Sequence, residues 1–171
     1  MTVPSLSFHD GKSMPQLGFG LWQVPEDTTA GTAKAALDMG YRLLDGAAIY
    51  GNEVGQGAGV AASGLARDEV FITTKVWNSR HGAAETRAAV AESLTRLKLS
   101  HIALCLIHWP CPNQNKYVET WQTLIDLRKE GLIRSIGVSN FNVDHLERII
   151  ADTGVKPVLN QIELHPFMQQ D

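Results

Sequence analysis

Asp45, Tyr50, Lys75 and His108 are the residues of this chain whose types and spacing favour donation of a proton to a substrate oxygen. A tyrosine is a weak acid near neutral pH, and a nearby ammonium makes it a stronger one by stabilising the phenolate. We expect Lys75 to supply that charge and Asp45 to hold Lys75 in place. His108 is expected to hydrogen-bond the substrate oxygen. Singly, each residue has an ordinary role as a surface charge or packing group, so their joint placement supports the prediction.

Ser139, Asn140 and Gln161 form a second group, with one hydroxyl and two side-chain amides. These groups match the donors and acceptors of a planar carboxamide, such as that of a nicotinamide ring. The alternative is that Asn140 caps the following helix and Gln161 pairs with neighbouring backbone. Together with a proton donor, the carboxamide interpretation points to an oxidoreductase.

Trp22, Trp77 and Trp109 each follow the end of a predicted strand, so they are expected at the rim of one face. Three tryptophans at one rim favour a largely apolar substrate pocket with a few polar groups. The fourth, Trp121, fits the buried side of a helix and is assigned to the core.

The elements that must position these residues alternate between strand and helix signals. Strands are predicted over residues 17–21, 42–45, 70–75, 102–108, 133–139 and 157–163. Helices are predicted from a cap at Asp27 or Thr28 to Gly40, over 53–63 and 83–97, from Asn115 to Gly131, and over 143–151 after a cap at Asn142. Five of the candidate residues, Asp45, Lys75, His108, Ser139 and Gln161, lie where these strands end.

Successive strand ends are separated by about 30 residues, which is the length of one strand–helix unit of a (β/α)8 barrel. Such alternation predicts parallel strands joined by right-handed helical crossovers. The first 16 residues predict a hairpin, with Ser5–Phe8 and Ser13–Gln16 flanking an Asp10-Gly11 turn. We therefore expect an α/β TIM-barrel fold in which this chain supplies the hairpin and about six strand–helix units.

The composition favours one globular domain over residues 1–171, with 44% hydrophobic residues, 19% charged residues and a net charge of −3. It shows no basic patch for nucleic acid, no apolar run long enough for a membrane span and no signal peptide. Cys105 and Cys111 are expected as reduced thiols, which favours the cytoplasm. The histidines and cysteines show no metal-ligand spacing.

Five segments resemble the motifs of the aldo-keto reductases, and among these the bacterial 2,5-diketo-D-gluconate reductases. The segments are residues 43–53 (LLDGAAIYGNE), 72–77 (ITTKVW), 106–110 (LIHWP), 136–141 (IGVSNF) and 160–166 (NQIELHP). The resemblance implies a TIM-barrel enzyme that reduces an aldehyde or ketone to an alcohol. The small-molecule substrate would be reduced with NADPH, or with NADH as the alternative.

The resemblance also implies a role for each matching residue. Tyr50 would be the proton donor, Lys75 and Asp45 the pair that makes it a stronger acid, and His108 the residue that orients the carbonyl. Ser139, Asn140 and Gln161 would hold the nicotinamide. The substrate pocket would be lined by Trp22, Ile49, Trp77 and Trp109.

Two departures from the family pattern stand out. Position 46 is Gly where the family usually has Ser or Thr, and the lost hydroxyl is expected to loosen Asp45 or to leave a cofactor contact to water. The chain is also shorter than the about 250 residues of a typical barrel. We therefore expect the last two strands and the C-terminal tail to be absent, as in a fragment of a longer enzyme. A full-length protein would be a monomer, whereas a truncated one would self-associate through an exposed edge at 158–163.

Two other functions remain open from the sequence. One is a non-catalytic nicotinamide-binding subunit or an inactive fragment. The other is an aldolase that uses Lys75 as a Schiff-base nucleophile, although Tyr50 and Gln161 would then have no role. The physiological substrate and the choice between NADPH and NADH are not determined by these residues.

Overall fold

A six-stranded parallel sheet forms the centre of the computed structural model, which describes residues 4–170. Its strands, in spatial order, are β3 (Phe19–Gly20), β4 (Leu43–Asp45), β5 (Phe71–Val76), β6 (Ile102–Ile107), β7 (Ile133–Ser139) and β8 (Asn160–Gln161). Spatial order follows chain order, as in a barrel built from repeated units. The prediction of a barrel-type α/β fold is confirmed.

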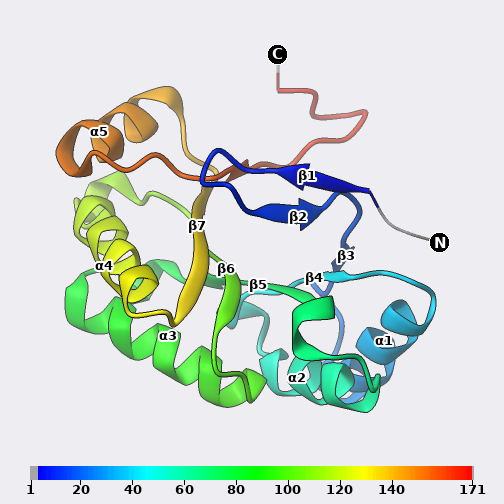
Figure 1. The fold of residues 1–171 in the computed structure, drawn as a ribbon. Coiled ribbons are helices and arrows are strands. Elements are labelled where there is room, and N and C mark those ends of the chain that lie inside the picture. Colours follow the sequence, from blue (N-terminus) through cyan, green and yellow to red (C-terminus); the bar gives the residue numbers. More distant parts are fainter. Residues whose placement is uncertain (1–3, 171) are drawn as a thin grey trace.

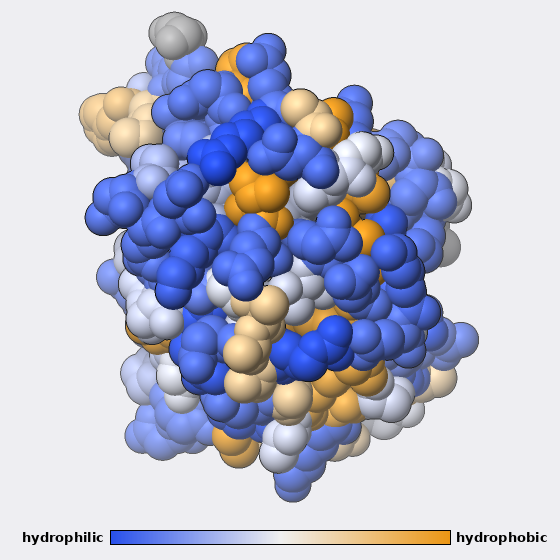
Figure 2. All heavy atoms as spheres, turned by 90° about the vertical axis from the view of Figure 1, so that its left-hand side faces the viewer, coloured by the Kyte–Doolittle hydropathy of each residue, from blue (hydrophilic) through white to orange (hydrophobic). Residues whose placement is uncertain are grey.

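Five helices follow the strands and lie along the outside of the curved sheet (Figure 1). They are α1 (Glu26–Asp38), α2 (Glu53–Ala62), α3 (Ala83–Leu97), α4 (Tyr117–Lys129) and α5 (Val143–Thr153). The face that carries α4 and α5 is largely hydrophilic, with apolar groups scattered between polar ones (Figure 2). This is the pattern expected when each helix buries one side only.

The predicted N-terminal hairpin is present. β1 (Ser5–Ser7) pairs antiparallel with β2 (Ser13–Pro15), and Gly11 in the turn has a φ of 82° that glycine adopts without strain. The hairpin (blue in Figure 1) packs near the starts of β7 and β8, where Asp10 accepts a hydrogen bond from Ser135 Oγ and His9 Nε2 lies 3.0 Å from the Pro157 carbonyl oxygen.

Two predicted helix starts are wrong. α1 begins at Glu26 with Pro25 at the N-cap, so Asp27 and Thr28 lie inside the first turn rather than capping it. Proline is tolerated at this position because its ring fixes φ at about −65°, and Pro25 has a φ of −61°. Asn115 precedes α4 with a φ of 52° and closes a short 3-10 turn, so it does not open the helix. Asn142 stands at the N-cap of α5, as predicted.

The first and last strands are shorter than predicted. Residues 17–21 and 157–163 contain only the two-residue strands β3 and β8. Within the described residues each of these strands pairs on one side only, so fewer ladder hydrogen bonds keep the backbone extended.

Apolar side chains between the helices and the sheet form the core. Trp121, Leu124 and Ile125 of α4 are buried against β6 and β7, which confirms the predicted inward face of that helix. α2 approaches the end of α3 closely because residue 57 is glycine. A Cβ at Gly57 would lie 2.3 Å from the carbonyl oxygen of Leu97. No helix in residues 4–170 combines the length and the hydropathy needed to cross a membrane.

Glu53, at the start of α2, is a buried carboxylate that ties three elements together. It is 1% exposed and accepts hydrogen bonds from Thr74 Oγ1 (2.6 Å), Ser93 Oγ (3.2 Å) and Arg96 Nε (2.7 Å). A buried charge is tolerated only when it is paired and hydrogen-bonded. Because Thr74 immediately precedes Lys75, this network fixes the backbone beneath the candidate site.

We expect Glu53→Gln to lower the free energy of unfolding by about 2 kcal/mol, because the amide loses the charge and turns an N–H donor toward other donors. Urea denaturation measures the change. Glu130→Gln is the matched control, since the Arg87–Glu130 pair is solvent-exposed and such pairs contribute little. Equal losses in the two variants would contradict a structural role for the Glu53 network.

Candidate active site

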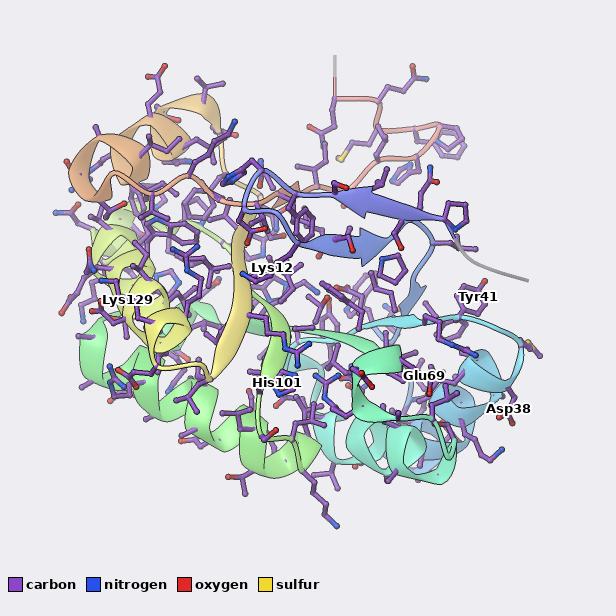
Figure 3. The ribbon with its side chains drawn as sticks, viewed as in Figure 1. Lys12, Asp38, Tyr41, Glu69, His101 and Lys129 are labelled. Carbon is purple, nitrogen blue, oxygen red and sulfur yellow. The ribbon has the colours of Figure 1, made fainter. Side chains whose placement is uncertain are left out.

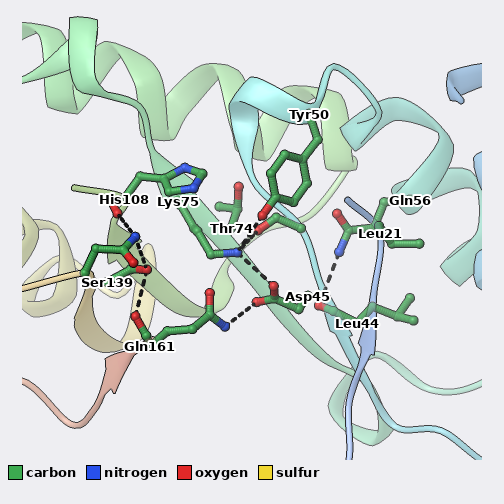
Figure 4. Close-up of polar contacts among 12 residues, drawn as sticks. Leu21, Leu44, Asp45, Tyr50, Gln56, Thr74, Lys75, His108, Ser139 and Gln161 are labelled. Atoms are coloured by element: carbon green, nitrogen blue, oxygen red, sulfur yellow. Dashed lines mark hydrogen bonds and ion pairs between the residues drawn. The ribbon is translucent and has the colours of Figure 1, made fainter. Parts of the chain in front are cut away.

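The C-terminal ends of the parallel strands bring the predicted residues to one edge of the sheet (Figure 4). Asp45 ends β4, Lys75 lies in β5 one residue before its end, and His108 follows β6 directly. Ser139 ends β7 and pairs in register with Gln161 of β8. Tyr50 and Ile49 lie on a short 3-10 turn, Ala48–Tyr50, which follows β4.

Lys75 is the buried centre of this cluster. Its side chain is 1% exposed, and its ammonium donates to Asp45 Oδ2 (2.8 Å), the Gly46 carbonyl (3.0 Å) and the Tyr50 hydroxyl (3.4 Å). A lysine has three N–H donors, so these three acceptors satisfy it completely. The Tyr50 oxygen therefore accepts a hydrogen bond from Lys75, which leaves its own proton free to be donated elsewhere.

His108 packs edge-on against two aromatic rings. Its ring centroid lies 6.0 Å from that of Tyr50 and 5.0 Å from that of Trp77. Burial and the positive charge of Lys75 lower the pKa of His108 to about 4, against the opposing effect of Asp45. The imidazole is therefore neutral near neutral pH and can donate one hydrogen bond.

We expect the His108 ring to show no protonation in an NMR titration between about pH 5 and 8, because its folded-state pKa lies below that window. The unfolded chain takes up this proton first as the pH falls, so stability falls between about pH 6.5 and pH 4. The missing resonance in His108→Gln assigns the signal. A midpoint near 6.5 would show that neither burial nor Lys75 acts on the ring.

Ser139, Asn140 and Gln161 are brought together, and they are hydrogen-bonded to their surroundings. Ser139 Oγ donates to the Gln161 carbonyl (3.0 Å), and Asn140 Nδ2 donates to the His108 carbonyl (3.0 Å). The alternative that Asn140 caps the next helix is wrong, because Asn142 occupies that position.

Gln161 also makes a contact that the sequence did not indicate. Its Nε2 donates to Asp45 Oδ1 at 3.2 Å, across 116 residues of sequence. One carboxylate oxygen of Asp45 thus faces Lys75 and the other faces Gln161. The two predicted groups, the proton-donating cluster and the amide group, share this carboxylate.

A cavity of about 760 Å³ opens above the cluster and is lined by nine of the eleven predicted site residues. These nine are Trp22, Ile49, Tyr50, Trp77, His108, Trp109, Ser139, Asn140 and Gln161. Trp22, Ile49 and Trp109 are 67%, 46% and 45% exposed, which places them at the rim. Asp45 and Lys75 do not line the cavity. Lys75 contacts the lining residue Tyr50, and Asp45 contacts the lining residue Gln161.

Sequence reasoning missed Gln23, Ile162 and Glu163, which also line this cavity. Their positions directly after Trp22 and Gln161 in the sequence were the signal that could have predicted them. It also missed Asn52, a fully buried amide that donates to the carbonyls of Leu21 and Val24, both at 2.9 Å. Asn52 thereby holds the loop that carries Trp22, and no motif marks such a role.

A second cavity, of about 620 Å³, lies at the opposite end of the strands beneath the hairpin. Lys12 and Glu69, both labelled in Figure 3, are among its lining residues. None of the predicted site residues lines it, whereas nine of them line the cavity at the C-terminal strand ends. Across the described part of the chain, His, Cys, Asp and Glu residues form no group of three or more that could bind a metal ion.

Known proteins are similar to this chain over nearly its whole length. A model described as the Aldo/keto reductase family matches residues 16–171. Methylglyoxal reductase DkgA of Yersinia pestis is 49% identical over 168 residues, covering 98% of this chain and 60% of that protein. The chain thus spans about 60% of the length of the curated relatives it matches.

Solved structures agree with the fold. An aldo/keto reductase from Brucella melitensis matches with a TM-score of 0.96 at 49% identity, covering 99% of this chain and 66% of that one. A mutant of Gox0644 in complex with NADPH matches with a TM-score of 0.93 at 49% identity, covering 99% and 61%.

Proposed function

This chain belongs to the aldo/keto reductase family, and from that premise we propose that it reduces aldehydes or ketones to alcohols with NADPH. The observation that supports this most is the Tyr50 hydroxyl, which lines the 760 Å³ cavity and accepts a hydrogen bond from the buried Lys75 ammonium. We further propose that residues 1–171 act as one domain and that the protein works in the cytoplasm.

The lining of the cavity fits a nicotinamide. Ser139, Asn140 and Gln161 all line it. The side-chain oxygens of the three residues offer acceptors, and the second N–H of the Gln161 amide offers a donor, as a carboxamide requires. When bound, the reduced cofactor supplies the hydride for the carbonyl carbon. The choice of NADPH is supported by the complex of the Gox0644 mutant with NADPH.

Tyr50 is the proposed proton donor to the carbonyl oxygen. Its proton is free because its oxygen already accepts from Lys75. As the proton leaves, the buried Lys75 ammonium stabilises the phenolate that forms. The neutral His108 ring beside Tyr50 donates a second hydrogen bond to the substrate oxygen and orients it.

The rim favours a compact carbonyl compound. Trp22, Ile49, Trp77 and Trp109 give the cavity apolar walls above the polar cluster. A relative with 49% identity is named methylglyoxal reductase. We propose that small ketoaldehydes are substrates, with methylglyoxal as the first probe.

The aldolase alternative is disfavoured by the state of Lys75. A Schiff-base lysine must be uncharged and must reach the substrate, whereas this ammonium has three acceptors and does not line the cavity.

The direct test is the loss of NADPH absorbance when the protein is mixed with methylglyoxal and a panel of aldehydes and ketones. We expect oxidation that depends on both protein and carbonyl. Tight NADPH binding without oxidation on any compound would favour the non-catalytic binding module instead. Borohydride trapping of a substrate on Lys75 would support the aldolase.

A further inference from the structure

The space beside Gly46 is occupied by the side chain of Gln56. A Cβ built on Gly46 would lie 2.3 Å from Gln56 Oε1 and 3.1 Å from its Cδ. The φ of Gly46 is outside the left-handed region, so the backbone conformation does not itself require glycine. A side chain at position 46 would require the Gln56 amide to move, because that amide fills the place beside Gly46. The place that a side chain at position 46 would take is thus filled by Gln56.

Gln56 reaches this place from the first turn of α2, where it is fully buried. Its Nε2 donates to the Leu44 carbonyl at 3.4 Å, and its Oε1 has no hydrogen-bond partner among the described residues. A buried acceptor without a donor is destabilising. The side chain thus packs against Leu44 of β4 and against Gly46. This packing leaves the Oε1 atom of Gln56 without a hydrogen bond.

The backbone that Gln56 contacts is the part that holds Lys75. Asp45 and Gly46 supply two of the three acceptors of the Lys75 ammonium, the Asp45 carboxylate and the Gly46 carbonyl. On its other side Gly46 is fixed by one hydrogen bond, from its N–H to the Thr73 carbonyl at 3.1 Å. A shift of this short segment would move both acceptors together.

We propose that Gln56 is a positioning residue: it fills the missing side chain of Gly46 and sets the Asp45–Gly46 segment where it fixes Lys75 beneath Tyr50. The link to catalysis rests on the proposed carbonyl reduction, whereas the packing of Gln56 on Gly46 does not. The proposal therefore has one test by stability and one by kinetics.

The stability test places Gly46→Ala in two backgrounds. In the wild-type protein the new methyl group meets Gln56, and we expect the melting temperature to fall by about 3–10 °C. In the Gln56→Ala background the space is open, and we expect no fall or a small rise, because alanine restricts the unfolded chain. Equal falls in both backgrounds would overturn the packing claim.

Asn52→Ala is the matched control background. Asn52 is a buried amide at the N-cap of α2, the helix that carries Gln56, but its side chain contacts Leu21 and Val24 instead of Gly46. There Gly46→Ala should lower the melting temperature as much as in the wild type, because the Asn52 side chain bonds Leu21 and Val24 and its loss leaves Gln56 against Gly46. Relief in this background as well would show that the effect is unspecific and would overturn the proposal.

The kinetic test compares Gln56→Ala with Gln56→Met, which keeps the length of the side chain. We expect Gln56→Ala to lower kcat about 10-fold with little change in the Kd for NADPH, and Gln56→Met to stay within about 3-fold of wild type. Wild-type kcat in a folded Gln56→Ala protein would overturn the positioning role. Absence of turnover in the wild type itself would reject the proposed function, and the stability test would still decide the packing claim.

Discussion

Replacing Tyr50 by phenylalanine is expected to lower kcat for carbonyl reduction by about 10²–10⁴-fold, the usual contribution of a positioned general acid. Phenylalanine keeps the ring that packs against His108 but removes the proton and the oxygen that accepts from Lys75. The Kd for NADPH should stay within about 2-fold, because the proposed nicotinamide contacts are made by other residues. Steady-state kinetics and a fluorescence titration with NADPH measure the two quantities.

Tyr41→Phe is the matched control for this substitution. Tyr41 packs edge-on against Phe19 and does not line the cavity at the strand ends. We expect its loss of a hydroxyl to leave kcat unchanged. Retention of near-wild-type kcat in Tyr50→Phe would remove Tyr50 as the proton donor.

Lys75→Met is expected to lower kcat by at least about 10²-fold, because no fixed positive charge would then stabilise the phenolate. It should also lower the free energy of unfolding by about 2–3 kcal/mol, since Asp45 would be left without its cation. This is below the range for fully buried pairs, because the Asp45 side chain is 22% exposed. Kinetics and urea denaturation separate the two losses.

The double variant Lys75→Met with Asp45→Asn distinguishes catalysis from stability. Replacing both partners of a buried pair removes the uncompensated charge and is often close to neutral. We therefore expect most of the stability to return while kcat stays low. Recovery of kcat together with stability would show that Lys75 is needed for folding alone.

The placement of the Asp45, Tyr50, Lys75 and His108 cluster could be predicted because it follows from local sequence. Lys75 and His108 lie at the ends of buried strands, and parallel strands bring such ends to one edge. Trp22, Trp77 and Trp109 could be predicted for the same reason, since each lies within two residues of such an end. The side-chain partners at that edge also depend on how far the strands curl and tilt.

Contacts that depend on this curvature could not be predicted. The Gln161–Asp45 hydrogen bond joins β8, the last strand in the sheet order, to β4, the second strand. Only the curling of the sheet brings Gln161 Nε2 within 3.2 Å of Asp45 Oδ1. The packing of Gln56 on Gly46 depends on the depth at which α2 lies against β4, which the helix pattern does not determine. A buried glutamine looks like any polar helix residue in sequence.

Boundaries at the first and last strands were predicted less well than the central elements. α3 and β7 have the predicted bounds, Ala83–Leu97 and Ile133–Ser139, because neighbours on both sides reinforce their patterns. β3 and β8 lack a second neighbouring strand among the described residues, so they are shorter than their apolar runs predict.

The most direct test of the central claim is a product balance for methylglyoxal and NADPH with the wild-type protein. The proton-donating cluster in this cavity predicts that one molecule of hydroxy-carbonyl product forms for each NADPH consumed. Tyr50→Phe should form almost none in the same time. NADPH bound but not consumed, or equal product from both proteins, would contradict the account.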